Sequence, residues 1–185
     1  MTPLTLSVPG RTLVLVAGIP GAGKSTLLGT LAPDTGTVVL DSDAHRAALR
    51  DVLQPLPYGW YRWLVHLWHR LSVLVAAFST IPTVVVHLPA TADGTRAAVL
   101  RIAALSGRTP HLLWLDVDAA TARAGQADRG RMVPGSSFAR HVRDAAVPPA
   151  ADGWGSVTVA DRTDAAGGLV LQHAPVEVSV PSQGQ

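Results

Sequence analysis

Residues 18–26 read GIPGAGKST, and they directly follow the apolar run TLVLVA of residues 12–17. The segment fits the pattern G-x-x-x-x-G-K-[ST], in which glycines allow main-chain N–H groups to converge on phosphates. The apolar run before the pattern predicts a buried strand, and the residues from about Ser25 onward predict a helix. A strand, a glycine-rich loop and a helix in this order predict a nucleotide-binding P-loop in an α/β fold.

The loop also assigns roles to its polar residues. We expect Lys24 to reach the outer phosphates of ATP and the Ser25 hydroxyl to bind Mg²⁺. Lys24 is the single lysine among 15 cationic residues, which points to a chemical role for it. A GTPase would need a second lysine in an N-K-x-D motif, although GTP stays open as an alternative phosphoryl donor. The residues of this segment expected to hold the nucleotide are Gly21, Ala22, Gly23, Lys24, Ser25 and Thr26.

Length and composition favour one globular domain. A chain of 185 residues with 48% hydrophobic residues can build one core but hardly two. The absence of cysteine excludes disulfides and thiolate chemistry, and no apolar run is long enough to span a bilayer. A net charge of +2 without a basic run does not favour nucleic-acid binding. We therefore expect a cytoplasmic, monomeric or homodimeric protein with a single domain over residues 1–174 and a flexible tail over residues 175–185.

Strand and helix patterns alternate along the chain, as in a parallel sheet covered by helices on both faces. The expected fold is a P-loop NTPase sandwich of three layers with five parallel strands and an Arg-rich lid at about residues 123–137. The strands are expected at residues 12–17, 37–41, 82–88, 112–117 and 157–160. Helices are expected from about residue 25 and at residues 44–53, 60–79, 94–106, 119–129, 138–146 and, weakly, 165–172.

The second expected strand ends in a polar cluster, VVLDSDAHR at residues 38–46. The carboxyl ends of parallel strands share one edge of the sheet, so Asp41 and Asp43 should face the P-loop. We expect Asp43, rather than Asp41, to accept the proton of an attacking hydroxyl, and Asp41 to help hold the metal. Arg46 should hold the acceptor or steady Asp43. An alternative is that Ser42 or Asp43 only caps the following helix.

Three segments resemble the kinase domain of phage polynucleotide 5′-hydroxyl kinase and its relatives, which include small antibiotic-modifying phosphotransferases such as those for chloramphenicol. The segments are GIPGAGKST, DSDAHR and LDVDAATARAGQADRGRMVP at residues 115–134, and the likeness covers most of residues 12–143. The resemblance implies that Asp43 is the general base, that Arg46 helps hold the acceptor and that Arg129 grips the donor phosphates. Arg131 would also contact the nucleotide, since lid arginines neutralise charge on the transferred group; a merely solvated Arg-rich helix is the alternative.

Two differences from this family restrict the class of acceptor that the chain is expected to bind. The polynucleotide kinases have a second lid arginine where this chain has Gly125, so Arg123 or Arg131 would have to replace it. They also have an Asp-Thr pair after the third strand, where this chain has His87 and Leu88. A leucine cannot donate a hydrogen bond to a phosphate, so the acceptor is not expected to be a polynucleotide end.

Residues 59–69 read GWYRWLVHLWH and are rich in aromatic side chains. We expect this helix to cover the acceptor pocket, with Tyr61, Trp63 and His87 contacting a planar acceptor. Core packing or a dimer interface is an alternative for the extra aromatic residues. Helical spacing predicts that one stripe of the helix is core, namely Trp60, Leu64, Leu67, Leu71, Leu74 and Phe78.

The sequence thus favours an ATP- and Mg²⁺-dependent phosphotransferase acting on a hydroxylated small molecule, for example an antibiotic or a nucleoside-like natural product. A polynucleotide or nucleoside 5′-hydroxyl kinase is the second hypothesis. A regulatory nucleotide-binding ATPase without an acceptor is the third.

Overall fold

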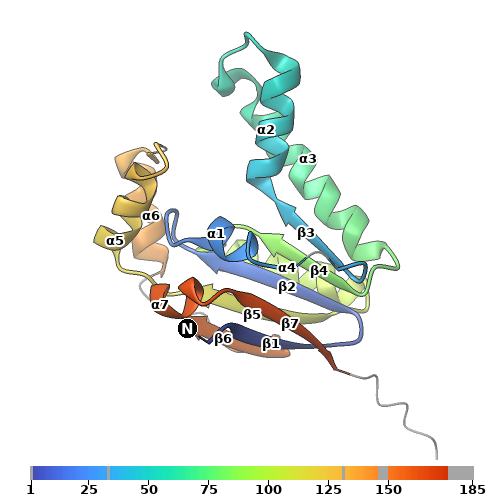
Figure 1. Ribbon diagram of the computed structural model, residues 1–185. Helices are drawn as coiled ribbons and strands as arrows, with labels where there is room; N and C mark the ends of the chain where they lie inside the picture. The colour runs from blue at the N-terminus through green and yellow to red at the C-terminus, as the bar shows by residue number, and fades with distance from the viewer. Residues whose placement is uncertain (1, 33, 131, 146–149, 175–185) are drawn as a thin grey trace, which may run out of the picture.

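The computed structural model describes residues 2–32, 34–130, 132–145 and 150–174, and its centre is a five-stranded parallel sheet (Figure 1). The spatial order of the strands is β3-β4-β2-β5-β6. Their bounds are β2 (Thr12–Gly18), β3 (Thr37–Asp41), β4 (Thr83–His87), β5 (Thr109–Leu115) and β6 (Ser156–Ala160). β2 lies in the middle and all of its residues are buried, so the loop that follows it sits at the centre of the sheet's carboxyl edge. The predicted five-stranded P-loop fold is confirmed.

Two hydrophobic cores form on opposite faces of the sheet because successive side chains of a strand point to opposite sides. Leu13 and Leu15 of β2 pack in one core, and Val14 and Val16 pack in the other. The first core is closed by α3 and α4, and the second by α1 and by strands outside the central sheet. The helices are α1 (Lys24–Leu28), α2 (Ser42–Leu53), α3 (Tyr58–Phe78), α4 (Asp93–Leu105), α5 (Ala119–Ala127), α6 (Gly135–Ala145) and α7 (Arg162–Ala166).

A second, smaller sheet was not predicted. β1 (Leu4–Pro9) pairs in parallel with β7 (Leu169–Ala174), and Leu6 of β1 is buried against the core. The weak helix predicted at residues 165–172 is therefore wrong. Asp161 caps α7 so that it begins three residues earlier than predicted, and Gly168, with φ of 87°, redirects the chain into an extended strand. The tail predicted at residues 175–185 lies outside the described residues.

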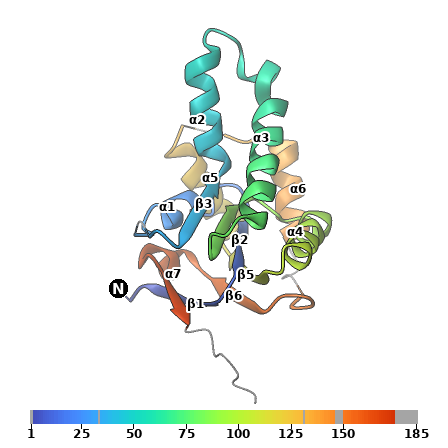
Figure 2. The same ribbon diagram turned by 90° about the vertical axis from the view of Figure 1, so that its right-hand side faces the viewer.

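α2 and α3 project together as an arm from the β3 and β4 side of the sheet (Figures 1 and 2). Only a narrow stripe of α3 is buried, consisting of Tyr61, Val65, His69, Val73, Ala76 and Ala77. The core stripe predicted from Trp60 to Phe78 is wrong, since both of these side chains are exposed, by 74% and 58%. The arm extends past the sheet, so α3 has α2 on one side and no second layer over its outer face. Although α3 has 21 residues, no helix in the described part of the chain is long and apolar enough to cross a membrane.

The base of the arm is fixed by Arg108, which precedes β5 and is 4% exposed. Its guanidinium donates to main-chain carbonyls at the end of α3, including Ala77 O at 2.6 Å and Ala76 O at 3.2 Å. It also donates to Ile81 O and Pro82 O, both at 2.8 Å, just before β4. One cation thus satisfies carbonyls that the end of a helix leaves without partners, and it ties α3 to the sheet.

Candidate active site

The P-loop connects β2 to α1, and its glycines adopt conformations that other residues rarely reach. Gly18, Gly21 and Gly23 have φ of 138°, 96° and 97°. Lys24 is 5% exposed, and its Nζ donates to Gly18 O at 2.8 Å and to Ile19 O at 2.9 Å. Burial lowers the pKa of Lys24 to about 7, helped by the positive charge of Arg129 and opposed by the nearby aspartates. A phosphate group near Nζ would restore its full charge.

Asp41 ends β3 at the centre of a hydrogen-bonded cluster. Its Oδ1 accepts from the Asp43 main-chain N–H at 2.9 Å and lies 2.7 Å from His87 Nδ1 at the end of β4. Burial opposes ionisation of Asp41, but bonding and charge from His87, the Asp43 N–H and the Ser25 hydroxyl outweigh it and hold the pKa at about 2. Asp41 is therefore a fixed carboxylate that joins the P-loop, β4 and the start of α2.

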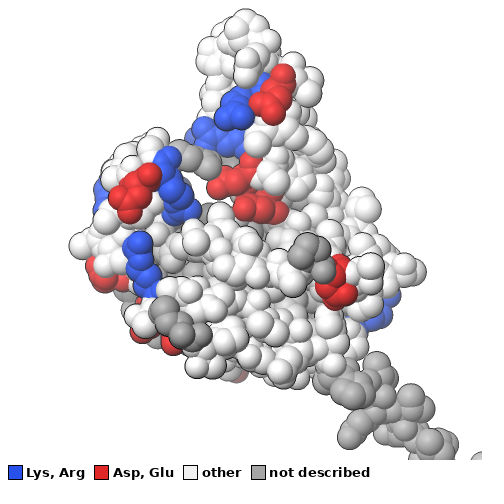
Figure 3. Space-filling model, viewed as in Figure 1, with Lys and Arg blue, Asp and Glu red and all other residues white. Residues whose placement is uncertain are grey.

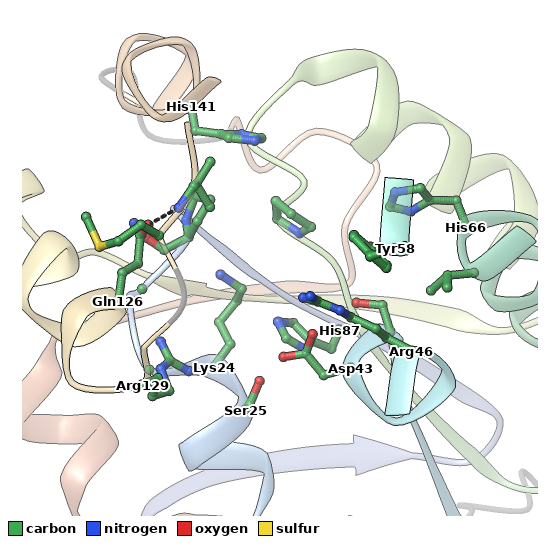
Figure 4. A pocket seen from close by; sticks show the side chains of 18 residues that line it. Lys24, Ser25, Asp43, Arg46, Tyr58, His66, His87, Gln126, Arg129 and His141 are labelled. Atoms are coloured by element: carbon green, nitrogen blue, oxygen red, sulfur yellow. Dashed lines mark hydrogen bonds between the residues drawn. The ribbon is translucent and has the colours of Figure 1, made fainter. Parts of the chain in front are cut away.

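Asp43 and Arg46 lie on the first turns of α2 and face the P-loop. Figure 4 shows both side chains on the side of the cavity opposite Arg129, with Lys24 and Ser25 between them. The Arg46 guanidinium lies over the Tyr58 ring, 4.0 Å from its centroid. Stacking on an aromatic ring holds a guanidinium in one orientation while leaving its N–H groups in the ring plane for a ligand.

α5 lies directly against the P-loop. Gln126 Nε2 donates to Pro20 O at 2.8 Å, and Gln126 Oε1 accepts from Val133 N–H at 2.8 Å. A Cβ added at Gly125 would lie 2.8 Å from Gly21 O, closer than real Cβ contacts allow. This close approach explains why position 125 carries no side chain, and therefore no lid arginine.

The arginines after β5 have separate positions. Arg129 lines the cavity, and its Nε donates to Gly125 O at 2.9 Å, which orients the side chain along α5. Arg123 instead lies over the Phe138 ring at 4.3 Å, joining α5 to α6, and does not line the cavity. Arg123 is thus not placed to replace the absent lid arginine. Arg131 lies outside the described residues.

A cavity of about 340 Å³ joins these groups. It lies between the arm and the α5–α6 lobe, where the space-filling view shows a hollow with acidic and basic side chains around it (Figure 3). This volume falls in the range of small-molecule sites. The sequence-predicted residues that line it are Gly21, Gly23, Lys24, Ser25, Asp43, Arg46, His87 and Arg129.

Other residues that were expected at the site do not line the cavity. Ala22 is buried in the core at 2% exposure, and Thr26 is exposed on α1. Tyr61 is 7% exposed and packs edge-on against Tyr58 at 5.4 Å, so it supports a wall residue from behind. Trp63 is 64% exposed and does not line the cavity. The expected acceptor contacts from Tyr61 and Trp63 are therefore not supported, and Tyr58 and His66 are the ring side chains of α3 that line the cavity.

Sequence reasoning missed several wall residues besides Tyr58 and His66. Gln126 was not recognised, although its position three residues before Arg129 was a usable signal. His141 of α6 lines the cavity, and its Nδ1 lies 2.7 Å from Thr91 Oγ1 in the β4–α4 connection. No pattern in the sequence indicates that α6 folds back over the P-loop, so His141 could not be found in advance.

The residues at this site fit Mg²⁺ bound together with a nucleotide. No group of three or more His, Cys, Asp or Glu in the described ranges could hold a metal by itself. Mg²⁺ with a triphosphate needs only one or two protein oxygens, because phosphates and waters supply the rest. The Ser25 hydroxyl and the carboxylate of Asp41, whose low pKa keeps it ionised, are the oxygens that fit this requirement.

Comparison with known proteins agrees with the fold. The model of a family described as an AAA domain matches residues 13–147. No curated protein matched the chain in sequence. A candidate kinase of Chloroflexus aurantiacus j-10-fl is similar in structure, with a TM-score of 0.62 and 19% identity over 83% of this chain and 86% of that one.

Two further structures share the fold. One belongs to the PezAT toxin-antitoxin system of Streptococcus pneumoniae, with a TM-score of 0.61 and 12% identity over 83% of this chain and 69% of that one. The other is a gluconokinase from Sinorhizobium meliloti 1021, with a TM-score of 0.52 and 16% identity over 82% of each chain. At these identities the likeness concerns the fold.

Proposed function

This chain belongs to the AAA domain family, as a P-loop kinase domain, and from that premise we propose that it transfers the γ-phosphoryl group of ATP to a hydroxyl of a small molecule. The observation that carries the proposal is the position of Asp43 across the cavity from Arg129, with Lys24 between them (Figure 4). In-line transfer needs cationic groups on the phosphates and a base on the opposite side, next to the attacking oxygen.

The donor side consists of Lys24, Arg129 and the P-loop main chain. The ammonium of Lys24 exchanges its bonds to Gly18 O and Ile19 O for phosphate oxygens, and Arg129 stabilises the charge on the transferred group. Mg²⁺, held by Ser25 and Asp41, would neutralise charge on the β- and γ-oxygens. Burial of Lys24 strengthens its interaction with the phosphates because the local dielectric is low.

The acceptor side consists of Asp43, Arg46 and Tyr58. The Asp43 carboxylate takes the proton of the acceptor hydroxyl as the new oxygen–phosphorus bond forms and the bond to the β-phosphate oxygen breaks, so ADP leaves. Arg46, stacked on Tyr58, positions the acceptor next to Asp43. His87 supports Asp41 rather than the acceptor, because its Nδ1 is bonded to that carboxylate.

The shape of the site supports a small acceptor. A cavity of about 340 Å³, bounded by the arm, holds a small molecule next to the terminal phosphate more easily than a polynucleotide end. Hydroxylated antibiotics and nucleoside-like natural products suit a wall that combines the Tyr58 ring with the guanidinium of Arg46. These compounds are the first acceptors to test.

The test is transfer from γ-labelled ATP to a panel of hydroxylated antibiotics, nucleosides, sugar acids and oligonucleotides with 5′-hydroxyl ends. Asp43→Asn should lower kcat about 10²- to 10⁴-fold with ATP affinity largely retained, because the group that takes the hydroxyl proton is lost while the P-loop is unchanged. Asp51→Asn on the same helix is the matched control, since Asp51 is exposed and pairs with Arg50. Full transfer by Asp43→Asn would contradict the assignment of the base. Efficient labelling of oligonucleotide ends would show that the acceptor is a polynucleotide and not a small molecule. Hydrolysis of ATP without phosphoryl transfer to any compound on the panel would support a nucleotide switch.

A further inference from the structure

The outer face of α3 is an apolar surface that no other helix or strand of the described residues covers. Figure 2 shows α3 in front with no other helix or strand over it. Three aromatic side chains of this face are 58–74% exposed, namely Trp60, Trp63 and Phe78. Leu67, Leu71, Leu74 and Val75 are exposed by 40–73% along the same helix. Soluble proteins seldom leave such a contiguous apolar patch free, so the face is a candidate for binding another helix.

The spacing of this face is that of two helices packed side by side. Apolar residues at positions 60, 64, 67, 71, 74 and 78 are separated by alternating steps of four and three. This is the repeat of the contact positions in a coiled coil, in which apolar residues recur every 3.5 residues. The buried stripe of α3 follows a different register, from Tyr61 through Val65, His69 and Val73. The helix thus has one apolar stripe that packs against its own chain and a second apolar stripe, here called the second seam, at positions 60, 64, 67, 71, 74 and 78 of the outer face.

The second seam reads the same from either end. Reversing its direction about residue 69 places Trp60 opposite Phe78, Leu64 opposite Leu74 and Leu67 opposite Leu71. Large rings then pair with large rings at the two ends, and leucines pair with leucines in the middle. A two-fold dimer interface requires this self-complementarity, because residue i of one copy contacts residue j of the other and the reverse.

We propose that two copies of this chain pair through the outer faces of their α3 helices, antiparallel and about a two-fold axis near residue 69. A helix of 21 residues is about 31 Å long, enough for several layers of contact. An aromatic side chain carries about 150–250 Å² of surface, so the three exposed rings alone offer on the order of 400 Å² per copy. With the aliphatic residues the face approaches the ~800 Å² per partner of a standard interface.

Charge argues against a membrane as the occupant. A helix that lies on a bilayer surface is usually rich in lysine and arginine on its polar side. α3 carries only Arg62 and Arg70, with no lysine and no acid. A second copy therefore accounts for the face better than a lipid surface does.

The first measurement is the mass of the full chain in solution, by light scattering and sedimentation between about 1 and 100 µM. The expected mass is twice the 19.3 kDa of one chain. Leu71→Arg places a charge near the proposed axis and should give a monomer over this range. Val170→Arg is the control, since Val170 is 42% exposed on β7, and it should remain dimeric. A wild-type protein that is monomeric throughout would overturn the proposal, whatever its enzymatic activity.

The direction of the helices is tested by cross-linking, because the chain contains no cysteine. In the antiparallel arrangement, Trp60→Cys and Phe78→Cys variants should form a disulfide when mixed and oxidised, and neither should link to itself. Self-linking of Trp60→Cys alone would indicate parallel helices and would refute the arrangement. Binding of the monomeric wild type to phosphatidylglycerol vesicles, lost in Leu71→Arg, would assign the face to a membrane and refute the dimer.

Discussion

Gly125→Ala tests how tightly α5 lies against the P-loop. The added Cβ would lie 2.8 Å from Gly21 O, whereas ordinary contacts begin near 3.4 Å, so α5 must withdraw by roughly 0.5 Å. The Gln126 Nε2–Pro20 O hydrogen bond, now 2.8 Å, would then exceed the usual limit of about 3.2 Å. Forcing one extra methyl group into such a contact costs about 1–3 kcal/mol.

This cost must appear in one of two measurable quantities. If α5 stays against the loop, the free energy of unfolding falls by that amount. If α5 withdraws, the loop loses its support and ATP affinity falls by about 5- to 150-fold, the same energy expressed as binding. Urea unfolding and calorimetric titration with ATP measure the two terms on one sample.

A matched variant separates this effect from helix propensity. Gly94→Ala makes the same change in α4, where the new Cβ meets no atom within 4 Å. It should leave ATP affinity unchanged and alter the free energy of unfolding by no more than about 1 kcal/mol, in the stabilising direction. Wild-type stability together with wild-type ATP affinity in Gly125→Ala would refute the close packing of α5 on the P-loop.

Three further changes have definite expected outcomes. Arg108→Met removes the guanidinium that donates to Ala77 O and Ile81 O and should lower the free energy of unfolding by about 3–5 kcal/mol in urea, whereas the exposed Arg101→Met should change it by less than about 0.5 kcal/mol. His69 is buried with neither ring nitrogen bonded within the described ranges, and burial lowers its pKa to about 4. Between about pH 6.5 and 4 this histidine is protonated in the unfolded chain but not in the folded chain, so the free energy of unfolding should fall by up to about 3 kcal/mol over that range. In His69→Leu the free energy of unfolding should depend less on pH in this range. Tyr58→Phe keeps the ring under Arg46 and should leave the acceptor KM nearly unchanged, whereas Tyr58→Ala should raise it about 2- to 30-fold in steady-state assays.

The sequence predicted the central sheet well because its strands are short apolar runs. The second strand was predicted at residues 37–41, where the structure has it, and the glycine-rich loop fixed the central strand. β1 was missed although its alternation of Leu4, Leu6 and Val8 with polar residues is a strand pattern, and each of its residues pairs with a residue of β7 that is 165 positions away. Local patterns cannot reveal a pairing that depends on the two ends of the domain meeting.

The register of α3 was predicted wrongly for a related reason. The helix has apolar residues on two sides, and periodicity alone does not say which side faces the chain's own core. The stripe from Trp60 to Phe78 has the larger side chains, but the stripe with smaller side chains, through Val65 and Val73, is the one that packs against α2 and the sheet. The choice depends on how α3 leaves the sheet.

The site residues divide in the same way. Lys24, Ser25, Asp41 and Asp43 follow strand ends, and the geometry of a parallel sheet brings strand ends together. Gln126 and His141 reach the cavity only because α5 and α6 fold back over the P-loop. Where Gln126 and His141 lie depends on the path of the chain that connects β5, α5 and α6, and the connecting residues have no periodic pattern from which this path could be predicted.

The burial of Lys24 gives the protein one unusual amine. Every other cationic side chain is an arginine or a histidine, so an acylating reagent that reacts with side-chain amines has a single target, inside the P-loop. With a pKa of about 7, much of this amine is uncharged and nucleophilic in mildly alkaline buffer. The number of modified Lys24 side chains would give the number of P-loops that can react. The decrease in modification when a nucleotide is added would give the occupancy of the nucleotide site, and this measurement does not require the acceptor to be known.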